Sequence, residues 1–347
     1  MTSLPREEGS GGLRGRLLIA AAAVLSRLPE APLVAGAEAC GEILYRISPG
    51  RRAQIRANLG RVCEGLAASG RGTALARRAA TDPEALERLV RRAFRHLVRY
   101  YLEVARVDSL DINVALERID LEDEDLVRAA LVPGRPVVVV GMHFGAIELP
   151  TVLFSHLVGH PVMAPMELVP DPGLRRWFVA SRRRVGVNVV PIVGARRVLL
   201  RALRGGESIG MAIDRDLMHN GMPIQFFGHP APISAGPALL AVEAGVPVYV
   251  GSVRRIAGRR YVVRVVPVPI PASGTRRERV FAITAGIVAE FERILAFGPE
   301  QWWGGFHAIW ADLAVGDQAA PEPQGGDPSP AADGPAAGRD EAPKGAP

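Results

Sequence analysis

The residues best suited to chemistry in this chain are His143 and Glu148, which follow a run of four valines at positions 137–140. Such a run is typical of a strand that is buried on both faces, and α/β proteins hold their reactive groups beyond the carboxyl ends of such strands. Imidazole titrates near neutral pH, so a histidine at this place can act as a general base towards a hydroxyl. A tight turn at Gly145 would bring the Glu148 carboxylate back to one ring nitrogen and leave the other facing a substrate. The alternative is a histidine at a helix start beside a surface glutamate.

A second charged group, Asp214, Arg215 and Asp216, follows the apolar segment at residues 209–213. If that segment is another strand of the sheet, the triplet lies at the same edge as His143. There the residues could order the site or bind a polyhydroxylated headgroup. As an isolated triplet, the same sequence is also typical of a turn.

Two further patterns suggest other chemistry but lack the context that it needs. Ser208 lies in a G-x-S-x-G sequence, yet a helix is expected before it and a strand after it, the reverse of a hydrolase nucleophile elbow. His156 and His160 are four residues apart but lack the adjacent glutamate of a zinc-binding H-E-x-x-H helix. Cys40 and Cys63 form no C-x-x-C pair, so we expect no metal and a reducing compartment.

The composition is that of a globular protein with a basic body. Of 347 residues, 48% are hydrophobic and 22% charged, and the formal net charge is +6. Because residues 316–347 carry six acidic against two basic residues, the remainder is more basic still. Such a surface indicates anionic partners, either phospholipid headgroups or nucleic acid. An aromatic content of 5% without interleaved basic and aromatic strands argues against binding of single-stranded nucleic acid.

Beyond residue 110, short apolar runs alternate with helical segments, which predicts an α/β fold with a central, mostly parallel sheet flanked by helices. We expect strands at 136–142, 160–164, 187–192, 208–213, 246–252 and 261–267. We expect helices at 146–158, 172–185, 195–204, 236–244 and 275–296. Residues 220–230 predict a turn, an apolar strand and another turn.

The N-terminal third, residues 13–110, reads as helical and basic. Its clearest helix begins at Asp82 and Pro83, a cap residue and a first-turn proline. Apolar residues then follow at helical spacing, and the opposite face carries Arg88, Arg91, Arg92, Arg95 and Arg99. That face is either solvated or in contact with an anionic bilayer.

No segment reaches the length of apolar sequence that a spanning helix needs. Residues 17–44 predict an apolar hairpin on a membrane surface, with a secretion signal or ordinary core helices as alternatives. We therefore divide the chain into a flexible N-terminus (1–12), a helical membrane-associating region (13–110), an α/β core (111–315) and a disordered acidic tail (316–347).

The segment from His143 to Glu148 resembles the H-x-x-x-x-[D/E] signature of the glycerophospholipid acyltransferase superfamily. More narrowly, the chain is similar to the branch that contains lipid A late acyltransferases and phosphatidylinositol mannoside acyltransferases. Further features agree in sequence order, namely Arg182 in an R-x-x-x-G pattern, Asp214-Arg215-Asp216, Phe226-Phe227-Gly228, Gly236-Pro237-Ala238 and Pro299-Glu300-Gln301-Trp302-Trp303 with Trp310. The triplet and the Phe-Phe-Gly sequence are closer to the mannoside enzymes, although Gln225 and His229 stand where that group has acids.

This resemblance implies an acyltransferase that takes no cofactor and uses acyl-CoA or acyl-carrier protein as co-substrate. His143 would deprotonate an acceptor hydroxyl while Glu148 holds its ring. Arg182 and Arg215 would meet phosphate or oxyanion charge, and Asp214 and Asp216 would bind sugar hydroxyls or fix those arginines.

The implied partners are anionic membrane lipids and the thioester donor, at the cytoplasmic face of the plasma (inner) membrane. A phosphatidylinositol mannoside is the favoured acceptor, with lipid A-type transfer as the alternative. Two alternative functions outside the acyltransferases remain open: a serine esterase that uses Ser208, and a non-catalytic lipid-binding protein.

Overall fold

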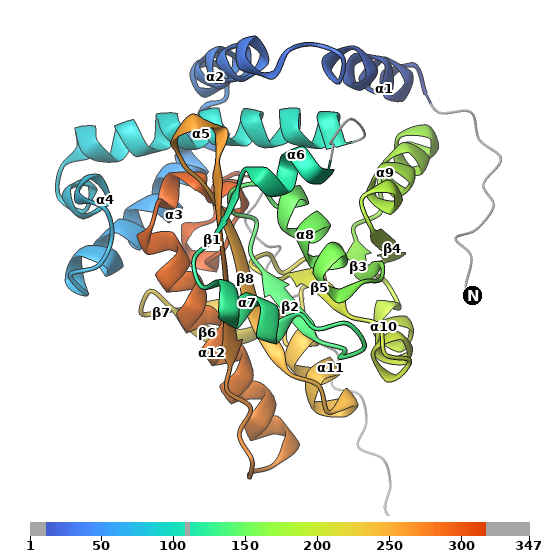
Figure 1. The fold of residues 1–347 in the computed structure, drawn as a ribbon. Coiled ribbons are helices and arrows are strands. Elements are labelled where there is room, and N and C mark those ends of the chain that lie inside the picture. Colours follow the sequence, from blue (N-terminus) through green and yellow to red (C-terminus); the bar gives the residue numbers. More distant parts are fainter. Residues whose placement is uncertain (1–11, 108–111, 317–347) are drawn as a thin grey trace, which may run out of the picture.

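The computed structural model describes residues 12–107 and 112–316, and Figure 1 shows a central sheet with helices on both of its faces. This confirms the predicted α/β class. The predictions for the N-terminus and the acidic tail fall, apart from Gly12 and Gly316, outside the described residues.

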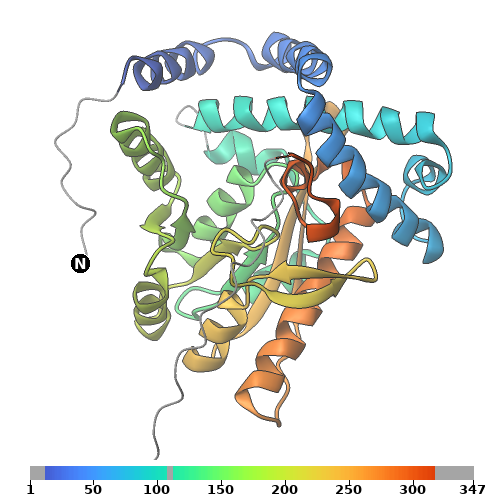
Figure 2. The same cartoon turned by 180° about the vertical axis from the view of Figure 1, so that it is seen from behind.

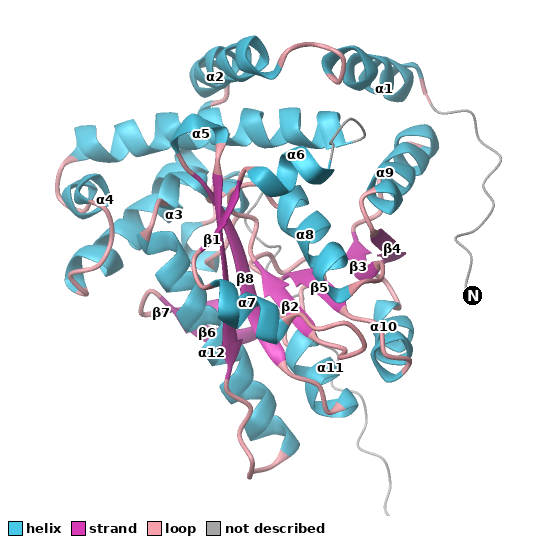
Figure 3. Cartoon of the chain, in the orientation of Figure 1, coloured by secondary structure: helices cyan, strands magenta, loops and turns pink. Residues whose placement is uncertain are grey.

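Within the described residues, seven strands form the main sheet in the order β1-β9-β8-β2-β5-β3-β4 (Figure 3). Their bounds are β1 Ile119–Leu121, β2 Val138–Gly141, β3 Val162–Met166, β4 Val187–Pro191, β5 Ile209–Ala212, β8 Val248–Arg255 and β9 Tyr261–Val268. The strands β2, β3, β4, β5 and β8 are parallel, β9 runs antiparallel to β8, and β1 is parallel to β9. The carboxyl ends of β2 and β5, which are neighbours, therefore meet at one edge of the sheet.

Helices cover both faces of this sheet. They are α6 Ile112–Glu117, α7 Glu124–Ala130, α8 Glu148–Val158, α9 Pro172–Arg184, α10 Ala195–Arg204, α11 Gly236–Ala244 and α12 Arg276–Ala296. The valine run of β2 packs in both directions: Val138 and Val140 belong to the core under α10, α11 and α12, and Val137 belongs to the core under α7 and α8. The strand is thus covered on both faces, as predicted, but only Val138 and Val140 are fully buried, and Val139 and Gly141 on the other face are half-buried.

The strands and helices expected from the sequence are all present, with bounds shifted by a few residues. Those that the sequence did not predict are short: β1, α6, α7 and β7 (His229–Ile233). The strand β7 pairs with β6 (Met222–Phe226) in an antiparallel hairpin outside the main sheet. A three-residue strand such as β1 is too short for an alternation of apolar and polar residues to be recognised in the sequence. Its three side chains are also all half-buried, so they do not alternate between the core and solvent.

Residues 12–107 form the helices α1 Leu13–Leu25, α2 Glu30–Ile47, α3 Pro49–Ala68, α4 Ala74–Ala79 and α5 Pro83–Arg106. The helix α5 begins as predicted, since the Asp82 carboxylate accepts hydrogen bonds from the backbone N–H groups of Glu84 and Ala85. Its basic face is partly covered by α2, because Arg91 and Arg95 approach Glu42 at 3.7 and 3.5 Å (Figure 1).

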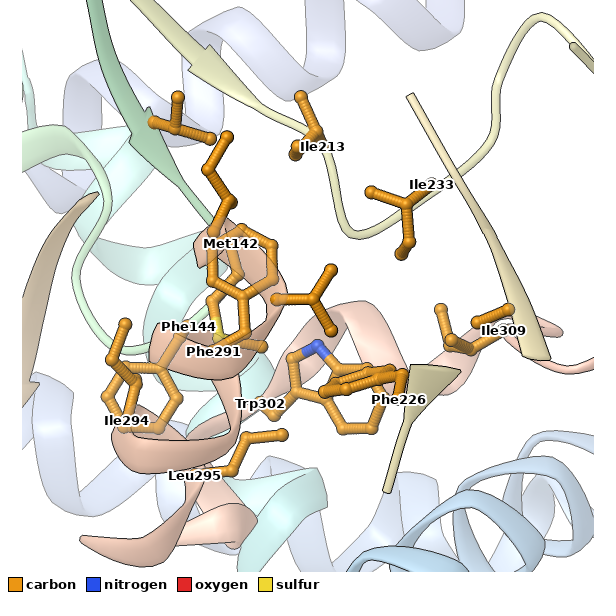
Figure 4. Packing of buried hydrophobic residues seen from close by; sticks show 14 of the residues in the cluster. Met142, Phe144, Ile213, Phe226, Ile233, Phe291, Ile294, Leu295, Trp302 and Ile309 are labelled. Carbon is orange, nitrogen blue, oxygen red and sulfur yellow. The ribbon is translucent and has the colours of Figure 1, made fainter. Parts of the chain in front are cut away.

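After α12 the chain crosses the edge of the sheet in short 3-10 turns, η3 (Pro299–Gln301), η4 (Trp303–Phe306) and η5 (Ala311–Leu313). Figure 2 shows this segment, in red, beside α3. Trp302, which is fully buried, joins it to the core and packs edge-on against Phe226 (Figure 4). These 3-10 turns are thereby anchored where β2 and β5 end.

Because of His96 in α5, we expect the folded protein to lose stability at acidic pH. Burial, followed by the charges of Arg255, Arg99 and Arg92, lowers its pKa to about 3, and its Nδ1 is buried without a hydrogen-bond partner. The unfolded chain therefore takes up this proton from about pH 6.5 downward while the folded chain resists it, so stability is lost as pH falls. Between about pH 7 and about pH 4.5, the unfolding free energy of the wild type should fall by about 2 kcal/mol more than that of His96→Phe.

Urea titrations at the two pH values measure this effect, with His156→Phe on the exposed side of α8 as the control. An equal pH dependence in wild type and His96→Phe would contradict the prediction.

Candidate active site

His143 lies just beyond the end of β2, held by its own backbone. Its N–H donates to Asp214 Oδ1 at 2.9 Å, and its carbonyl oxygen accepts from the N–H of Gly304 at 3.0 Å. The neighbouring side chains of Met142 and Phe144 are buried in the core (Figure 4). The position of the imidazole is therefore fixed by the sheet on one side and by η4 on the other.

The sharp turn after His143 depends on Gly145. This glycine has φ +58°, and a Cβ there would lie 1.7 Å from the carbonyl oxygen of Val253. Its N–H donates to the carbonyl oxygen of Gln301 at 3.0 Å. The predicted tight turn at Gly145 is present, and only a residue without a side chain fits it.

The carboxylate that holds the His143 ring is Asp214. Its Oδ1 lies 2.7 Å from Nδ1 of His143, and its Oδ2 accepts a hydrogen bond from the indole N–H of Trp302 at 2.8 Å. Asp214 follows β5, the parallel neighbour of β2, and its side chain has no exposed surface. With the ring proton on Nδ1, donated to this carboxylate, Nε2 is left as a base.

Asp214 is ionised in this setting. Burial raises the pKa of its carboxyl group, but the charge of His143 and the hydrogen bonds from His143 and Trp302 outweigh burial and bring the pKa below its usual value. A buried carboxylate with these partners both fixes the tautomer of the imidazole and stabilises its protonated form.

Glu148 has a different partner from the one expected. Its Oε1 accepts a hydrogen bond from Nη2 of Arg182 at 2.8 Å, in the first turn of α8. The expectation that Glu148 holds the imidazole is therefore corrected, because the parallel pairing of β2 and β5 brings Asp214 to that ring nitrogen instead. Asp214 is likewise not available for sugar hydroxyls.

The other two residues of the triplet lie at the same edge. Arg215 Nη2 is 3.7 Å from Glu167, and the carboxylate of Asp216 accepts from the backbone N–H groups of Asn220 and Gly221 at 3.2 and 2.9 Å. Asp216 thus orders the loop after β5 rather than an arginine. Arg182 and Arg215 reach the site from α9 and from the end of β5, respectively.

Aromatic rings pack against the imidazole from the side of η4. Trp303 lies edge-on to His143 with ring centroids 4.6 Å apart, and Tyr100 of α5 stacks on Trp303 at 3.9 Å. Burial, followed by the charge of Glu148, raises the pKa of the Tyr100 phenol, so that its hydroxyl stays protonated. The N-terminal helices therefore contribute to the site as well as the sheet.

A cavity of about 810 Å³ opens beside the imidazole, a size that suits a sizeable organic ligand. Its lining includes all of the predicted site residues except the buried Asp214, namely His143, Glu148, Arg182, Arg215 and Asp216. The structure thus brings the predicted residues together.

The cavity continues from this charged mouth between the sheet and α8. Gly141, Gly210 and Gly251 line it on the sheet side, and Leu153 and Phe154 of α8 line the other side. A Cβ added to Gly141 or Gly210 meets no atom closer than 3.5 Å, so the space exists because these strands carry no side chains there. Farther in, the lining is apolar, with Leu131, Val263 and Val265.

The sequence patterns set aside earlier do not take part. Ser208 is fully buried between α10 and β5 and accepts a hydrogen bond from the N–H of Val137 at 3.3 Å, so the reversed order around this serine is confirmed. Among residues 12–107 and 112–316, no group of three or more histidine, cysteine, aspartate or glutamate side chains is placed to hold a metal ion.

Comparison with known proteins shows which family this chain resembles. The model of the bacterial lipid A biosynthesis acyltransferase family matches residues 14–310. A phosphatidylinositol mannoside acyltransferase from Mycolicibacterium smegmatis is 30% identical over 221 residues, which cover 62% of this chain and 70% of the relative. A second, from Mycobacterium tuberculosis, is 28% identical over 213 residues, covering 59% of this chain and 65% of the relative.

Proposed function

This chain belongs to the bacterial lipid A biosynthesis acyltransferase family and is an acyltransferase, and we propose that it transfers a fatty acyl group from a thioester to a hydroxyl of a phosphatidylinositol mannoside-type glycolipid. Acyl-CoA or acyl-carrier protein is the donor. The observation that carries the proposal is the pair of His143 and the buried Asp214 at the mouth of a deep cavity. The names of the two mycobacterial relatives favour the mannolipid over a lipid A-type acceptor.

In the proposed reaction, Nε2 of His143 takes the proton of the acceptor hydroxyl as the oxygen attacks the thioester carbon. Asp214 stabilises the imidazolium that forms. The tetrahedral intermediate then expels the sulfur, which leaves as a thiol with the proton from Nε2. The new bond is an ester, no acyl-enzyme forms, and the base is restored.

Negative charge on the former thioester oxygen needs a nearby donor, and Arg182 lines the cavity beside His143. Its hydrogen bond to Glu148 holds the guanidinium in place and leaves further N–H groups free to donate. Glu148 is then a positioning residue for Arg182. This gives the H-x-x-x-x-E spacing a function that differs from orienting the histidine.

The apolar part of the cavity suits the acyl chain of the donor. Val139, which lines it, lies four residues before His143, a span of about 13 Å at the rise of an extended chain. Gly210 lies opposite Val139 in the register of β2 and β5. A side chain at position 210 would therefore block the apolar part of the cavity, at a point well beyond the reacting carbonyl group of the donor.

We expect Gly210→Val to change the chain-length preference. Its branched methyl groups would occupy the apolar space, so kcat/KM with palmitoyl-CoA should fall about tenfold while that with octanoyl-CoA changes little. Gly60→Val on α3 is a suitable control, since a Cβ there is also unobstructed (3.9 Å from Leu86) but does not line the cavity. Equal losses with both donors would place the acyl chain elsewhere.

The first two helices suit a membrane surface. In the described part of the chain, none of the helices combines the length and apolar character needed to cross a bilayer. Large apolar side chains are nevertheless exposed on α1, on α2 and between them, namely Leu13, Leu17, Leu18, Val24, Leu28, Ile43 and Ile47. Exposed arginines at positions 14, 16 and 27 accompany them. We propose that this surface rests on anionic lipid at the cytoplasmic face of the plasma (inner) membrane.

The test is transfer of labelled palmitate from palmitoyl-CoA to phosphatidylinositol mannoside in vesicles, with His143→Ala as the comparison. We expect a labelled glycolipid with wild type and with Ser208→Ala, but not with His143→Ala. Faster transfer to a lipid A precursor would replace the proposed acceptor. Vesicle binding without any transfer, unchanged in His143→Ala, would overturn the proposal.

A further inference from the structure

We propose that Arg51, Arg215 and His307 form a phosphate-binding subsite at the mouth of the cavity, separate from the groups that act on the thioester. All three residues line the cavity that contains His143. The inference rests on the proposed function, because it is this acyl transfer that brings phosphate-bearing substrates to the cavity.

The position of Arg51 follows from a row of polar residues along α3. Arg51, Gln54, Asn58 and Arg61 are spaced by three or four residues and so share one helix face. The last three of them hold the C-terminal segment. Gln54 bonds Leu313 and Val315, Asn58 donates to the carbonyl oxygens of Gly305 and His307, and Arg61 forms two hydrogen bonds with Asp312.

Arg51 is the first of this row and differs from the other three. Among the residues that the structure describes, it has neither an ion pair nor a hydrogen bond. It lies in the first turn of α3, which contains no acidic residue and whose N-cap, Ser48, makes no side-chain cap bond. The guanidinium and the positive end of the helix therefore both favour an anion at this place.

The backbone of His307 is held by the same row, since Asn58 donates to its carbonyl oxygen at 2.8 Å. Although the residue is exposed at the cavity mouth, the atoms around its ring and then the charges of Arg215 and His143 lower its pKa to about 4. At neutral pH the ring is therefore uncharged, with one N–H to donate. Arg51 lines the same cavity as His307, and its charge makes a smaller contribution to the lowering of this pKa.

The acidic residues nearby leave this subsite positive. Asp216 uses its carboxylate on two backbone N–H groups, and Glu148 is bonded to Arg182. Arg215 is 3.7 Å from Glu167, whose side chain is 60% exposed, so this pair is weak and can exchange for a ligand. Two arginines and a neutral histidine suit a phosphate, whose oxygens accept several such hydrogen bonds.

Either substrate can supply that group. The donor carries phosphates in CoA or in the phosphopantetheine arm of the carrier protein, and a phosphoinositide acceptor carries a phosphodiester. The shared chemistry is a phosphate held at the mouth while the acyl chain lies deeper. The experiment is therefore arranged to separate the two sources.

The variants are Arg51→Gln and Arg51→Lys, with Arg52→Gln as the control. Arg52 is the next residue of α3, but it lies over the ring of Tyr45 and does not line the cavity. We expect Arg51→Gln to raise KM for the phosphate-bearing substrate about tenfold with little change in kcat, and Arg51→Lys to restore part of the loss. Arg52→Gln should match wild type.

Replacing palmitoyl-CoA with palmitoyl-N-acetylcysteamine removes the donor phosphates, and replacing the phosphatidylinositol mannoside with a mannosyl diacylglycerol removes the acceptor phosphate. If the effect of Arg51→Gln disappears only with the first change, the subsite binds the donor. If it disappears only with the second, it binds the acceptor. An effect that persists with both phosphate-free substrates, or one no larger than that of Arg52→Gln, overturns the proposal.

Calorimetric binding of CoA and of glycerophosphoinositol mannoside keeps this result separate from the proposed function, because it needs no turnover. An affinity for one of them that falls about tenfold in Arg51→Gln supports the subsite even if no acyl transfer is found. Equal affinities in wild type, Arg51→Gln and Arg52→Gln would refute it even if transfer proceeds.

Discussion

Asp214→Asn is expected to lower kcat for acyl transfer about a thousandfold while the protein remains folded. The carboxylate holds the proton on Nδ1 of His143 and offsets the charge that the ring gains as it takes the acceptor proton. An amide at this place can present an N–H to Nδ1, which favours the tautomer whose Nε2 is protonated and cannot act as a base. Because Asp214 is fully buried and does not line the cavity, KM should change far less than kcat.

Steady-state rates with palmitoyl-CoA and a mannolipid acceptor measure this loss, and circular dichroism checks the fold. Glu148→Gln is the informative comparison. It keeps the size of the side chain but weakens the hold on Arg182, and we expect a loss of about tenfold to a hundredfold. A larger loss in Glu148→Gln than in Asp214→Asn would show that Glu148, and not Asp214, serves the histidine.

The sequence predicted His143 because the physical signal is local. A valine run that is covered on both faces specifies the strand β2, and Gly145 specifies the turn after it. Both depend only on residues next to the histidine. The helix boundaries were equally accessible, since capping residues such as Asp82 act within one turn.

The partner of His143 was not accessible in that way, because it depends on the order of strands. Asp214 is 71 residues from His143, and it reaches the ring only because β5 is placed beside β2 in the sheet. Five-residue spacing made Glu148 the nearest carboxylate in sequence, although its partner in space is Arg182. Strand order is a property of the whole core and cannot be read from a local pattern.

The contribution of the C-terminal turns was missed for the same reason. The aromatic pair Trp302 and Trp303 suggested family resemblance, but their sequence gave no physical reason for a place in the site. In the structure, Trp302 donates to Asp214 from 88 residues away, and Trp303 packs against His143. Two consecutive glycines, Gly304 and Gly305, follow them, and such a pair is the signal that a close approach of backbone was needed.

Gly304→Ala should lower kcat at least a hundredfold, which makes it the most damaging small substitution in this segment. A Cβ at position 304 would lie 2.1 Å from Oδ2 of Asp214, 2.9 Å from the indole nitrogen of Trp302 and 3.1 Å from Cβ of His143. The Asp214 and Trp302 side chains cannot easily move aside, because both are fully buried. The carboxylate must therefore move, and its hydrogen bonds to His143 and Trp302 must lengthen.

Gly305→Ala provides the matched control. Its Cβ would also meet buried atoms, 2.9 Å from Ile55 and 2.9 Å from the Trp302 ring, but it has no close approach to Asp214 or His143. We expect each substitution to cost about 2 kcal/mol of unfolding free energy through overpacking, measured by urea titration. Only Gly304→Ala should lose its kcat as well. Similar kcat values in the two variants would mean that the Asp214 carboxylate can shift without consequence, and that the imidazole is oriented by its backbone contacts instead.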